Sequence, residues 1–266
     1  VAGDVFDRSL PPEDAMELFG TWLTKIRAVL PNLPIVIISG NHDSGKRLSW
    51  ASSLLKSGGL YIRGNPKEVE VAIQVTTQNG EEAEIWALAF AWAGDLPQDE
   101  DDVVSQAGAF TSAMKIIESH RNPSKIQILV AHCFAVGGEV SESERQLLGQ
   151  ATLIESHQFS GFDYVALGHL HRPQRVLDHV WYSGSPLGYS FSECTHKKCI
   201  LLVDVSKSEI EVHKLPLSPL TSIHIIEDTY NVLTQTTKYD GFREDYLSIR
   251  LTEPCIEPNL MQSLRN

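Results

Sequence analysis

Short apolar segments that do not alternate with polar residues recur along this chain, and each ends in a turn rich in polar side chains. The clearest is PIVIIS at residues 34–39, which continues directly into Gly-Asn-His-Asp at 40–43. IQILVA at 126–131 and DYVALG at 163–168 have the same form, and a histidine follows each of them. Apolar runs of this kind are typical of strands in a sheet that is covered on both faces. The sequence therefore predicts an α/β fold built around such a sheet.

Helix and hairpin signals fill the segments between and after these strands. Residues 11–30 begin with two prolines and two acidic residues, and an apolar side chain then recurs at helical spacing, at Met16, Phe19, Leu23, Ile26 and Leu30. The other predicted elements are a short helix ended by glycine at 48–59, a hairpin around Asn79-Gly80 within 69–90, a helix at 103–120, and strands at 179–184, 199–205 and 209–215.

The residue patterns at the two ends of the chain differ from those in its middle. After LPLSPL at 215–220, the segments SIHIIED, YLSIRLTE and NLMQSLRN predict a small βαβα unit that stops abruptly. The first residues, VAGDVFD, have the pattern of the last two residues of a strand and the turn after it. Because strands usually need about five residues, we expect the natural protein to extend upstream of Val1.

Composition narrows the class of protein without settling its partner. The 266 residues, 42% of them hydrophobic, are enough for one large domain, or for one domain and a smaller one. No apolar run approaches the roughly 20 residues that span a bilayer, and no signal peptide is visible. The four cysteines form no C-x-x-C pair, so a zinc knuckle or a disulfide framework is not indicated, and a reducing cytoplasm is the expected location.

The net charge of −12 argues, taken alone, against a protein that binds nucleic acid. The charge is nevertheless uneven. Residues 94–102 form an acidic loop, whereas a basic cluster follows the Gly-Asn-His-Asp turn, at Lys46, Arg47, Lys56, Arg63 and Lys67. The net charge therefore does not decide whether nucleic acid is a partner.

Metal-capable side chains follow an apolar strand at four separate places in the chain. These side chains are Asp4 and Asp7, Asn41 and His42, His132, and finally His169 and His171. Ligand sites in α/β sheets lie at the carboxyl ends of the strands, so we expect the four turns to meet in one crevice. Carboxylate, amide and imidazole ligands together suit Mn, Fe, Zn or Co. Two such ions about 3.5–4 Å apart can clamp a phosphate, and a carboxylate such as that of Asp4 can bridge them.

Each of these turns, taken alone, has an ordinary structural explanation. A Gly-Asp pair after a strand is usually a turn, and a single histidine at a strand end is usually a hydrogen-bonded surface residue. It is the occurrence of all four turns, each after a strand, that favours a metal site. The remaining histidines lack this context and are expected to have no role in it: His120, His157, His179, His196, His213 and His224.

The order of these motifs resembles that of the calcineurin-like metallophosphoesterases, and within them that of the SbcD-type DNA repair nuclease subunits. The resemblance covers nearly the whole chain and rests on VAGDVFDRSLPPEDA, GNHDS, GGEVSESER, GFDYVALGHLHRPQ and YSGSPLGYSFSE. It implies a four-layer α/β/β/α sandwich at residues 1–215 and the start of a small α+β capping domain at 216–266.

The resemblance also implies a role for each site residue. Asp4 would bridge two divalent ions, Asn41, His132 and His169 would complete the ligands of one ion, and His171 would bind the other. His42 would face the scissile phosphate as a general acid or a stabiliser of the transition state, and the carboxylate of Asp7 would orient the His42 ring.

One family motif, an Asp-x-His on the first strand, does not occur at the start of this chain. We expect the motif, and the first strand with it, to lie upstream of Val1. The second ion would then keep Asp4 and His171 as its ligands here, and we expect the chain alone to be a poor nuclease.

The function implied is that of a metal-dependent nuclease subunit, an exonuclease or endonuclease that hydrolyses phosphodiester bonds at double-stranded DNA ends in repair and recombination. Two Mn²⁺ ions are the expected cofactors, with Mg²⁺ as the other option. The expected partners are DNA, an SbcC-type ATPase and a second copy of the chain within a heterotetramer, with no membrane. Two alternatives remain open: another calcineurin-like phosphodiesterase or phosphatase, or a non-catalytic scaffold that binds the ATPase.

Overall fold

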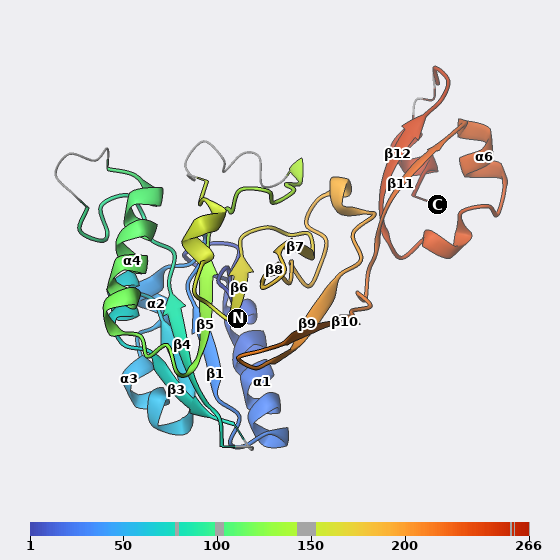
Figure 1. Cartoon of the computed structure of the whole chain (residues 1–266). Coiled ribbons are helices and arrows are strands. Elements are labelled where there is room, and N and C mark those ends of the chain that lie inside the picture. The colour runs from blue at the N-terminus through green and yellow to red at the C-terminus, as the bar shows by residue number, and fades with distance from the viewer. Residues whose placement is uncertain (78–79, 99–103, 143–152, 256, 258, 266) are drawn as a thin grey trace.

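A six-stranded mixed sheet forms the centre of the protein (Figure 1). The computed structural model describes residues 1–77, 80–98, 104–142, 153–255, 257 and 259–265. In spatial order, the strands of the central sheet are β3 (Ile73–Thr76), β4 (Glu82–Leu88), β5 (Ile126–His132), β6 (Tyr164–Gly168), β8 (Val180–Tyr182) and β7 (Gln174–Leu177). Strands β4, β5, β6 and β8 are parallel, and the two edge strands are antiparallel to their neighbours. The runs at 126–131 and 163–168 are therefore central strands, as predicted.

A second, smaller sheet lies beside the first. It contains β1 (Ile35–Ile38), which is the predicted strand before Gly-Asn-His-Asp, and β2 (Leu60–Arg63), which pairs with it in parallel. On the other edge of β1, Ala2 forms an isolated parallel bridge to Ile38. This bridge places the first loop of the chain next to the end of β1.

The buried side chains show how the two sheets and two long helices are layered. Alternate residues of β4 face opposite ways: Trp86 and Leu88 pack against helix α4 (Gln106–His120), whereas Ala87 packs toward Ile38 of the smaller sheet. On the far face of the smaller sheet, Ile35, Ile37 and Ile62 contact helix α1 (Glu13–Val29) through Phe19, Leu23 and Ile26. The resulting order, helix, sheet, sheet, helix, confirms the α/β fold and its four layers.

Helix α1 buries a narrower stripe than its sequence predicts. Met16 and Leu30 belong to the predicted apolar stripe but are 55% and 49% exposed. The physical reason is that α1 covers a sheet whose two paired strands are each four residues long, so that it contacts side chains over only its middle turns. The helix begins at Glu13 after Pro12, where the missing proline N–H costs nothing.

Shorter elements complete the described chain. They are α2 (Gly45–Leu48), α3 (Ser52–Leu55), η1 (Lys56–Gly58), η2 (Pro66–Glu70), η3 (Ser156–Phe159), η4 (Phe191–Glu193), and the antiparallel hairpin of β9 (Cys199–Val205) and β10 (Ile210–Pro216). Some predictions fall partly outside the described residues: Asn79 of the predicted hairpin turn, residue 103 of the predicted helix, 99–102 of the acidic loop, and 143–145 of GGEVSESER. In the part of the chain that is described, no helix is long and apolar enough to cross a membrane.

The C-terminal segment forms its own two-stranded sheet, away from the central sheet (Figure 1). Its elements are β11 (Ile223–Asp228), α6 (Tyr230–Gln235), η5 (Asp240–Phe242), β12 (Tyr246–Leu251) and α7 (Leu260–Ser263). Strands β11 and β12 are parallel and a helix lies between them in sequence, as the predicted βαβα unit requires. The boundary predicted between residues 215 and 216 falls one residue before β10 ends, and the division into two domains remains a prediction.

Candidate metal centre

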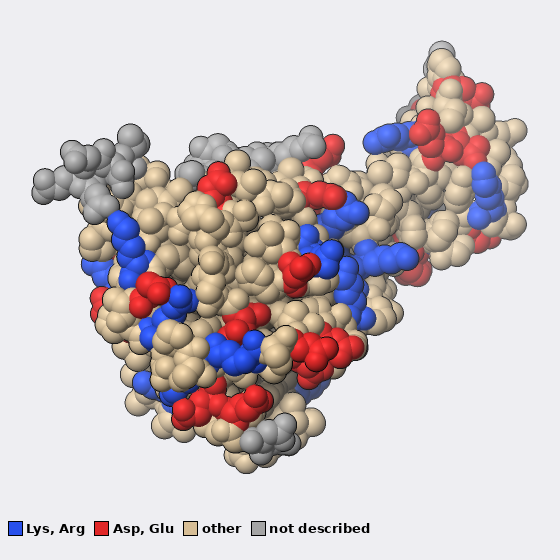
Figure 2. Space-filling view, in the orientation of Figure 1, with Lys and Arg blue, Asp and Glu red and all other residues tan. Residues whose placement is uncertain are grey.

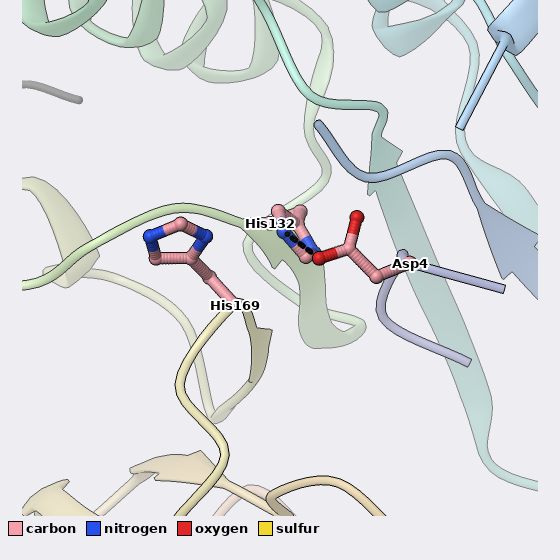
Figure 3. Close-up of side chains that lie close together, drawn as sticks. All are labelled: Asp4, His132 and His169. Atoms are coloured by element: carbon pink, nitrogen blue, oxygen red, sulfur yellow. Dashed lines mark ion pairs between the residues drawn. The ribbon is translucent and has the colours of Figure 1, made fainter. Parts of the chain in front are cut away.

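Four of the predicted site residues come together at the carboxyl ends of β1, β5 and β6. The Asn41 Oδ1 atom lies 2.9 Å from His132 Nε2 and 3.1 Å from His169 Nδ1. Asp4 Oδ2 lies 3.2 Å from the same His132 nitrogen. Figure 3 shows the Asp4 carboxylate and the two histidine rings close together. One ligand atom from each of these three residues lies within 4.8 Å of the others, so the side chains predicted to share an ion do converge.

Strand register explains why residues so far apart in sequence meet here. His132 is the last residue of β5 and pairs with Gly168, the last residue of β6, so His169 follows directly beside it. Asn41 comes three residues after the end of β1. The bridge between Ala2 and Ile38 brings the first loop, and with it Asp4, to the same edge.

Glycines allow the loops of the site to approach one another closely. A Cβ atom on Gly40 would lie 2.1 Å from Asp4 Oδ1, and one on Gly168 would lie 1.8 Å from the Ala2 carbonyl oxygen. Both distances are far below van der Waals contact. Any side chain at either position would therefore push the first loop away from β1 and β6.

Backbone hydrogen bonds hold two of the polar side chains in fixed orientations. The Nδ1–H of His132 donates to the Ala2 carbonyl at 2.7 Å, which leaves Nε2 directed at Asp4 and Asn41. The backbone N–H of His42 donates to Asp4 Oδ1 at 3.0 Å. Hydrogen bonds of this kind orient metal ligands and select the nitrogen that a histidine presents.

The ionisation states of the cluster follow from burial and from the neighbouring charges. Burial would raise the pKa of Asp4, but the His132 ring and the His42 N–H outweigh it and lower that pKa to about 2. Burial would lower the pKa of His132, yet Asp4 raises it above its ordinary value. For His169, burial and the nearby His132 act together and lower the pKa to about 3, so its ring is neutral at pH 7.

This set of donors fits a divalent transition ion. An ionised carboxylate, an amide oxygen and two imidazole rings already face one another, and one of these rings, His169, is neutral at pH 7. Mixed oxygen and nitrogen ligands suit Mn, Fe, Zn or Co better than Ca²⁺, which prefers oxygen alone.

The structure differs from the prediction for Asp7. The His42 ring is held at Nδ1 by the main-chain carbonyl oxygen of Asp7, at 2.9 Å, and not by the Asp7 carboxylate. The carboxylate is 70% exposed and lies 3.4 Å from the neighbouring Arg8. The turn explains the difference, because it directs the carbonyl toward His42 and the side chain toward solvent. A carbonyl can fix the orientation of the ring as a carboxylate would, but it adds no charge.

His171 lies outside the Asp4, His132 and His169 group found in the described chain. Its Nδ1 is 2.8 Å from Glu193 Oε1, and the buried Glu193 carboxylate also accepts a hydrogen bond from Lys198. Burial would raise the pKa of Glu193, but His171 and Lys198 lower it to about 2. Sequence reasoning missed Glu193 and Lys198. The available signal was the last residue of YSGSPLGYSFSE, which ends a 3₁₀ turn and not a strand.

Asp43 is a third residue that sequence reasoning left without a role. Its two carboxylate oxygens accept three backbone N–H groups, from Val5, Phe6 and Gly40, at 2.9–3.0 Å. Burial raises the Asp43 pKa despite these bonds. Asp43 therefore ties the loop that carries Asp4 to the turn that carries Asn41 and His42. The signal was its place as the fourth residue of Gly-Asn-His-Asp.

The six histidines that were set aside lie outside the Asp4, His132 and His169 group. Two of them show why. His120 ends α4 and bonds to Ile116 of the same helix, and His224 pairs with Asp245 in the C-terminal unit. His196 lies near the carboxylate that contacts His171, since its Nδ1 is 4.0 Å from Glu193 Oε2.

Comparison with known proteins agrees with this geometry. Residues 1–173 match the model of the calcineurin-like phosphoesterase family. The chain is also 30% identical over 257 residues to the SbcD subunit of the nuclease SbcCD from Staphylococcus epidermidis, an alignment that covers 95% of this chain and 67% of that relative. The chain belongs to the calcineurin-like phosphoesterase family, as an SbcD-type member.

Proposed function

We propose that this protein is a metal-dependent phosphodiester hydrolase that acts on double-stranded DNA ends. The observation that carries the proposal is the convergence of Asp4, Asn41, His132 and His169 on one another, in a chain similar to a nuclease subunit. The family supports a phosphoesterase reaction, and the relative, a nuclease subunit, favours a nucleic acid as the substrate.

Two divalent ions would be held by the residues that the sequence singled out. Asp4, Asn41, His132 and His169 would hold the first, and Asp4 and His171 would contribute to the second, with Mn²⁺ as the preferred metal. When bound, such ions supply Lewis acidity toward a phosphoryl group and a nucleophilic oxygen from water. Within the chain, the Ala2 carbonyl holds the His132 ring and the Glu193 carboxylate contacts the His171 ring. The backbone N–H of His42 holds the Asp4 carboxylate.

His42 is the residue that would act on the substrate. Its Nδ1–H is engaged by the Asp7 carbonyl, so the Nε2 nitrogen is the one available to a phosphate oxygen. A protonated His42 could stabilise the charge that develops on the phosphate, or donate its Nε2 proton to the leaving oxygen. Both roles leave metal binding to other side chains, although the His42 backbone N–H helps to hold Asp4.

The proposed partners are an SbcC-type ATPase and a second copy of the chain, within a heterotetramer. The name of the Staphylococcus relative supports an assembly with a second type of subunit. On the face in view in Figure 2, Lys and Arg are interspersed with Asp and Glu and form no continuous basic field. A chain with a net charge of −12 would then depend on its partner for part of its grip on DNA.

The test is Mn²⁺-dependent hydrolysis by this chain of three substrates: linear duplex DNA, bis(p-nitrophenyl) phosphate and p-nitrophenyl phosphate. His42→Ala provides the background rate. We expect slow cleavage of both diesters above that background. Hydrolysis of the monoester alone would replace the proposal with a phosphatase. No hydrolysis of any substrate despite bound Mn²⁺ would favour the non-catalytic scaffold.

A further inference from the structure

Glu193 and Lys198 form a buried ion pair directly behind His171. The two residues are 2% and 6% exposed. Glu193 Oε2 accepts from Lys198 Nζ at 2.7 Å, while Glu193 Oε1 lies 2.8 Å from His171 Nδ1. The carboxylate therefore joins a buried ammonium group to a histidine ring that is 24% exposed.

Lys198 is fully engaged by this arrangement. Besides Glu193, its Nζ donates to the carbonyl oxygen of His171 at 3.0 Å and to Ser185 Oγ at 2.8 Å. An ammonium group has three N–H donors, and all three are used here. Lys198 thus holds the His171 backbone and, through Glu193, the His171 ring.

Stability alone does not account for such a network. Taking both charges out of water costs several kcal/mol for each ion, and an apolar pair of similar size is often as stable or more stable. A role in orienting His171 does account for it. A carboxylate that accepts the Nδ1–H of histidine fixes the tautomer, places the ring's lone pair on Nε2 and makes that nitrogen more basic.

We propose that Glu193 is a positioning residue that presents His171 Nε2 to the second divalent ion, and that Lys198 keeps the Glu193 carboxylate in place. This inference rests on the proposed function and adds to it the residues that set the affinity of the second ion position. His132 is positioned in the same way by a backbone carbonyl, whereas His171 uses a charged group. The charge suits an ion with few other ligands in this chain.

Two measurements on the 266-residue chain test the proposal. Long-range ¹H–¹⁵N NMR of metal-free protein labelled at histidine reports which His171 nitrogen carries the proton, with His171→Ala used to assign the signal. Titration with Mn²⁺, followed by electron paramagnetic resonance, reports the number of ions bound and their affinities. Both are made on wild type, Glu193→Ala, Glu193→Gln and Lys198→Met.

A matched control separates positioning from general loss of buried polar contacts. Glu84 is also buried, and it accepts hydrogen bonds from Gln127 and the Asn122 N–H in the central sheet. It belongs to β4 and bonds to residues just before and within the start of β5, so it lies at the opposite end of the sheet from the metal-capable side chains. Glu84→Gln therefore makes the same chemical change as Glu193→Gln without touching His171.

We expect wild-type His171 to carry its proton on Nδ1 and Glu193→Ala to give a mixture of tautomers. The more weakly held Mn²⁺ should bind about 10–100-fold more weakly in Glu193→Ala, with a smaller loss in Glu193→Gln and Lys198→Met, while the tighter ion and the Glu84→Gln control stay near wild type. An unchanged tautomer in Glu193→Ala would overturn the inference. If wild type bound no Mn²⁺, the proposed function would fail, and the tautomer measurement would still decide whether Glu193 positions His171.

Discussion

Asp43 offers the sharpest test of how the first loop is held against the metal centre. Its carboxylate accepts three backbone N–H groups, two of them from the loop that follows Asp4 and one from Gly40. In Asp43→Asn, one oxygen remains and can take the place of Oδ2, which accepts from both Val5 and Gly40. The new NH₂ group would then face the Phe6 N–H, so two donors would oppose each other.

The size of the effect follows from this count. A hydrogen bond to a charged group contributes roughly 1.5–3 kcal/mol, and one to a neutral group roughly 0.5–1.5 kcal/mol. Because the site is only half-buried, the lower ends of these ranges apply. Losing one charged bond and weakening two others should lower the free energy of unfolding by about 3–4 kcal/mol for Asp43→Asn. Asp43→Ala removes all three bonds and should cost about 4–5 kcal/mol.

Urea denaturation followed by tryptophan fluorescence measures these differences, and Mn²⁺ titration measures whether the loop still presents Asp4. The control is Asp178→Asn, because the Asp178 side chain is 91% exposed and pairs with Arg175 on the surface. We expect this control to lie within about 0.5 kcal/mol of wild type. If Asp43→Asn matched the control in both stability and Mn²⁺ affinity, the three hydrogen bonds would not be what holds the loop.

Three further changes probe the rest of the centre. His42→Ala should leave the Mn²⁺ content nearly intact and slow phosphodiester cleavage by about 10²–10⁴-fold, and loss of metal measured by mass spectrometry would contradict its assignment to the substrate. Gly168→Ala should lower the free energy of unfolding by at least about 2 kcal/mol, because its Cβ would meet the Ala2 carbonyl at 1.8 Å. Gly20→Ala, on the open face of α1, should leave the free energy of unfolding unchanged or raise it by about 0.5–1 kcal/mol. In metal-free protein, the lowered pKa of Asp4 contributes stability above about pH 4, and this stability is lost as the pH falls toward 2. The raised pKa of His132 contributes stability below about pH 6.5, and this stability is lost as the pH rises through the pKa of the folded protein. Asp4→Asn should therefore flatten the stability curve at its acid end, and an unchanged acid end would contradict the Asp4–His132 pairing.

The convergence of Asp4, Asn41, His132 and His169 could be predicted from the sequence because its signal is local. An apolar run followed by a polar turn identifies the end of a strand, and parallel strands carry their carboxyl ends to one edge. His132 and His169 meet because β5 and β6 are neighbours in register, which makes their strand-end positions adjacent without any special contact. The same reasoning predicted β1 and its turn, and therefore Asn41 and His42.

The missed residues depend on contacts that no local pattern encodes. Glu193 reaches His171 from a 3₁₀ turn that comes after the strands of the central sheet, and Lys198 reaches back across that turn. The choice between the carbonyl and the carboxylate of Asp7 depends on the backbone angles of one turn. Strands β2 and β7 were missed because each is only four residues long, with Arg63 as the charged residue of β2 and with Gln174 and Arg175 in β7. Each forms a strand by pairing with a neighbouring strand.

Backbone conformation gives an independent indication that Asp4 and His169 serve function. Among the described residues other than glycine, these two have positive φ angles, +46° for Asp4 and +107° for His169. Side chains with a Cβ rarely adopt such angles, and each instance costs about 1–3 kcal/mol unless the surroundings impose it. A chain shaped only for stability would be expected to place glycine at both positions, as it does at Gly3 beside Asp4. The carboxylate and the imidazole are instead kept at the strained positions, where Asp4 lies against His132 and His169 lies against Asn41. The strain therefore favours a functional role for these two side chains, and both belong to the strand-end residues that the sequence analysis singled out.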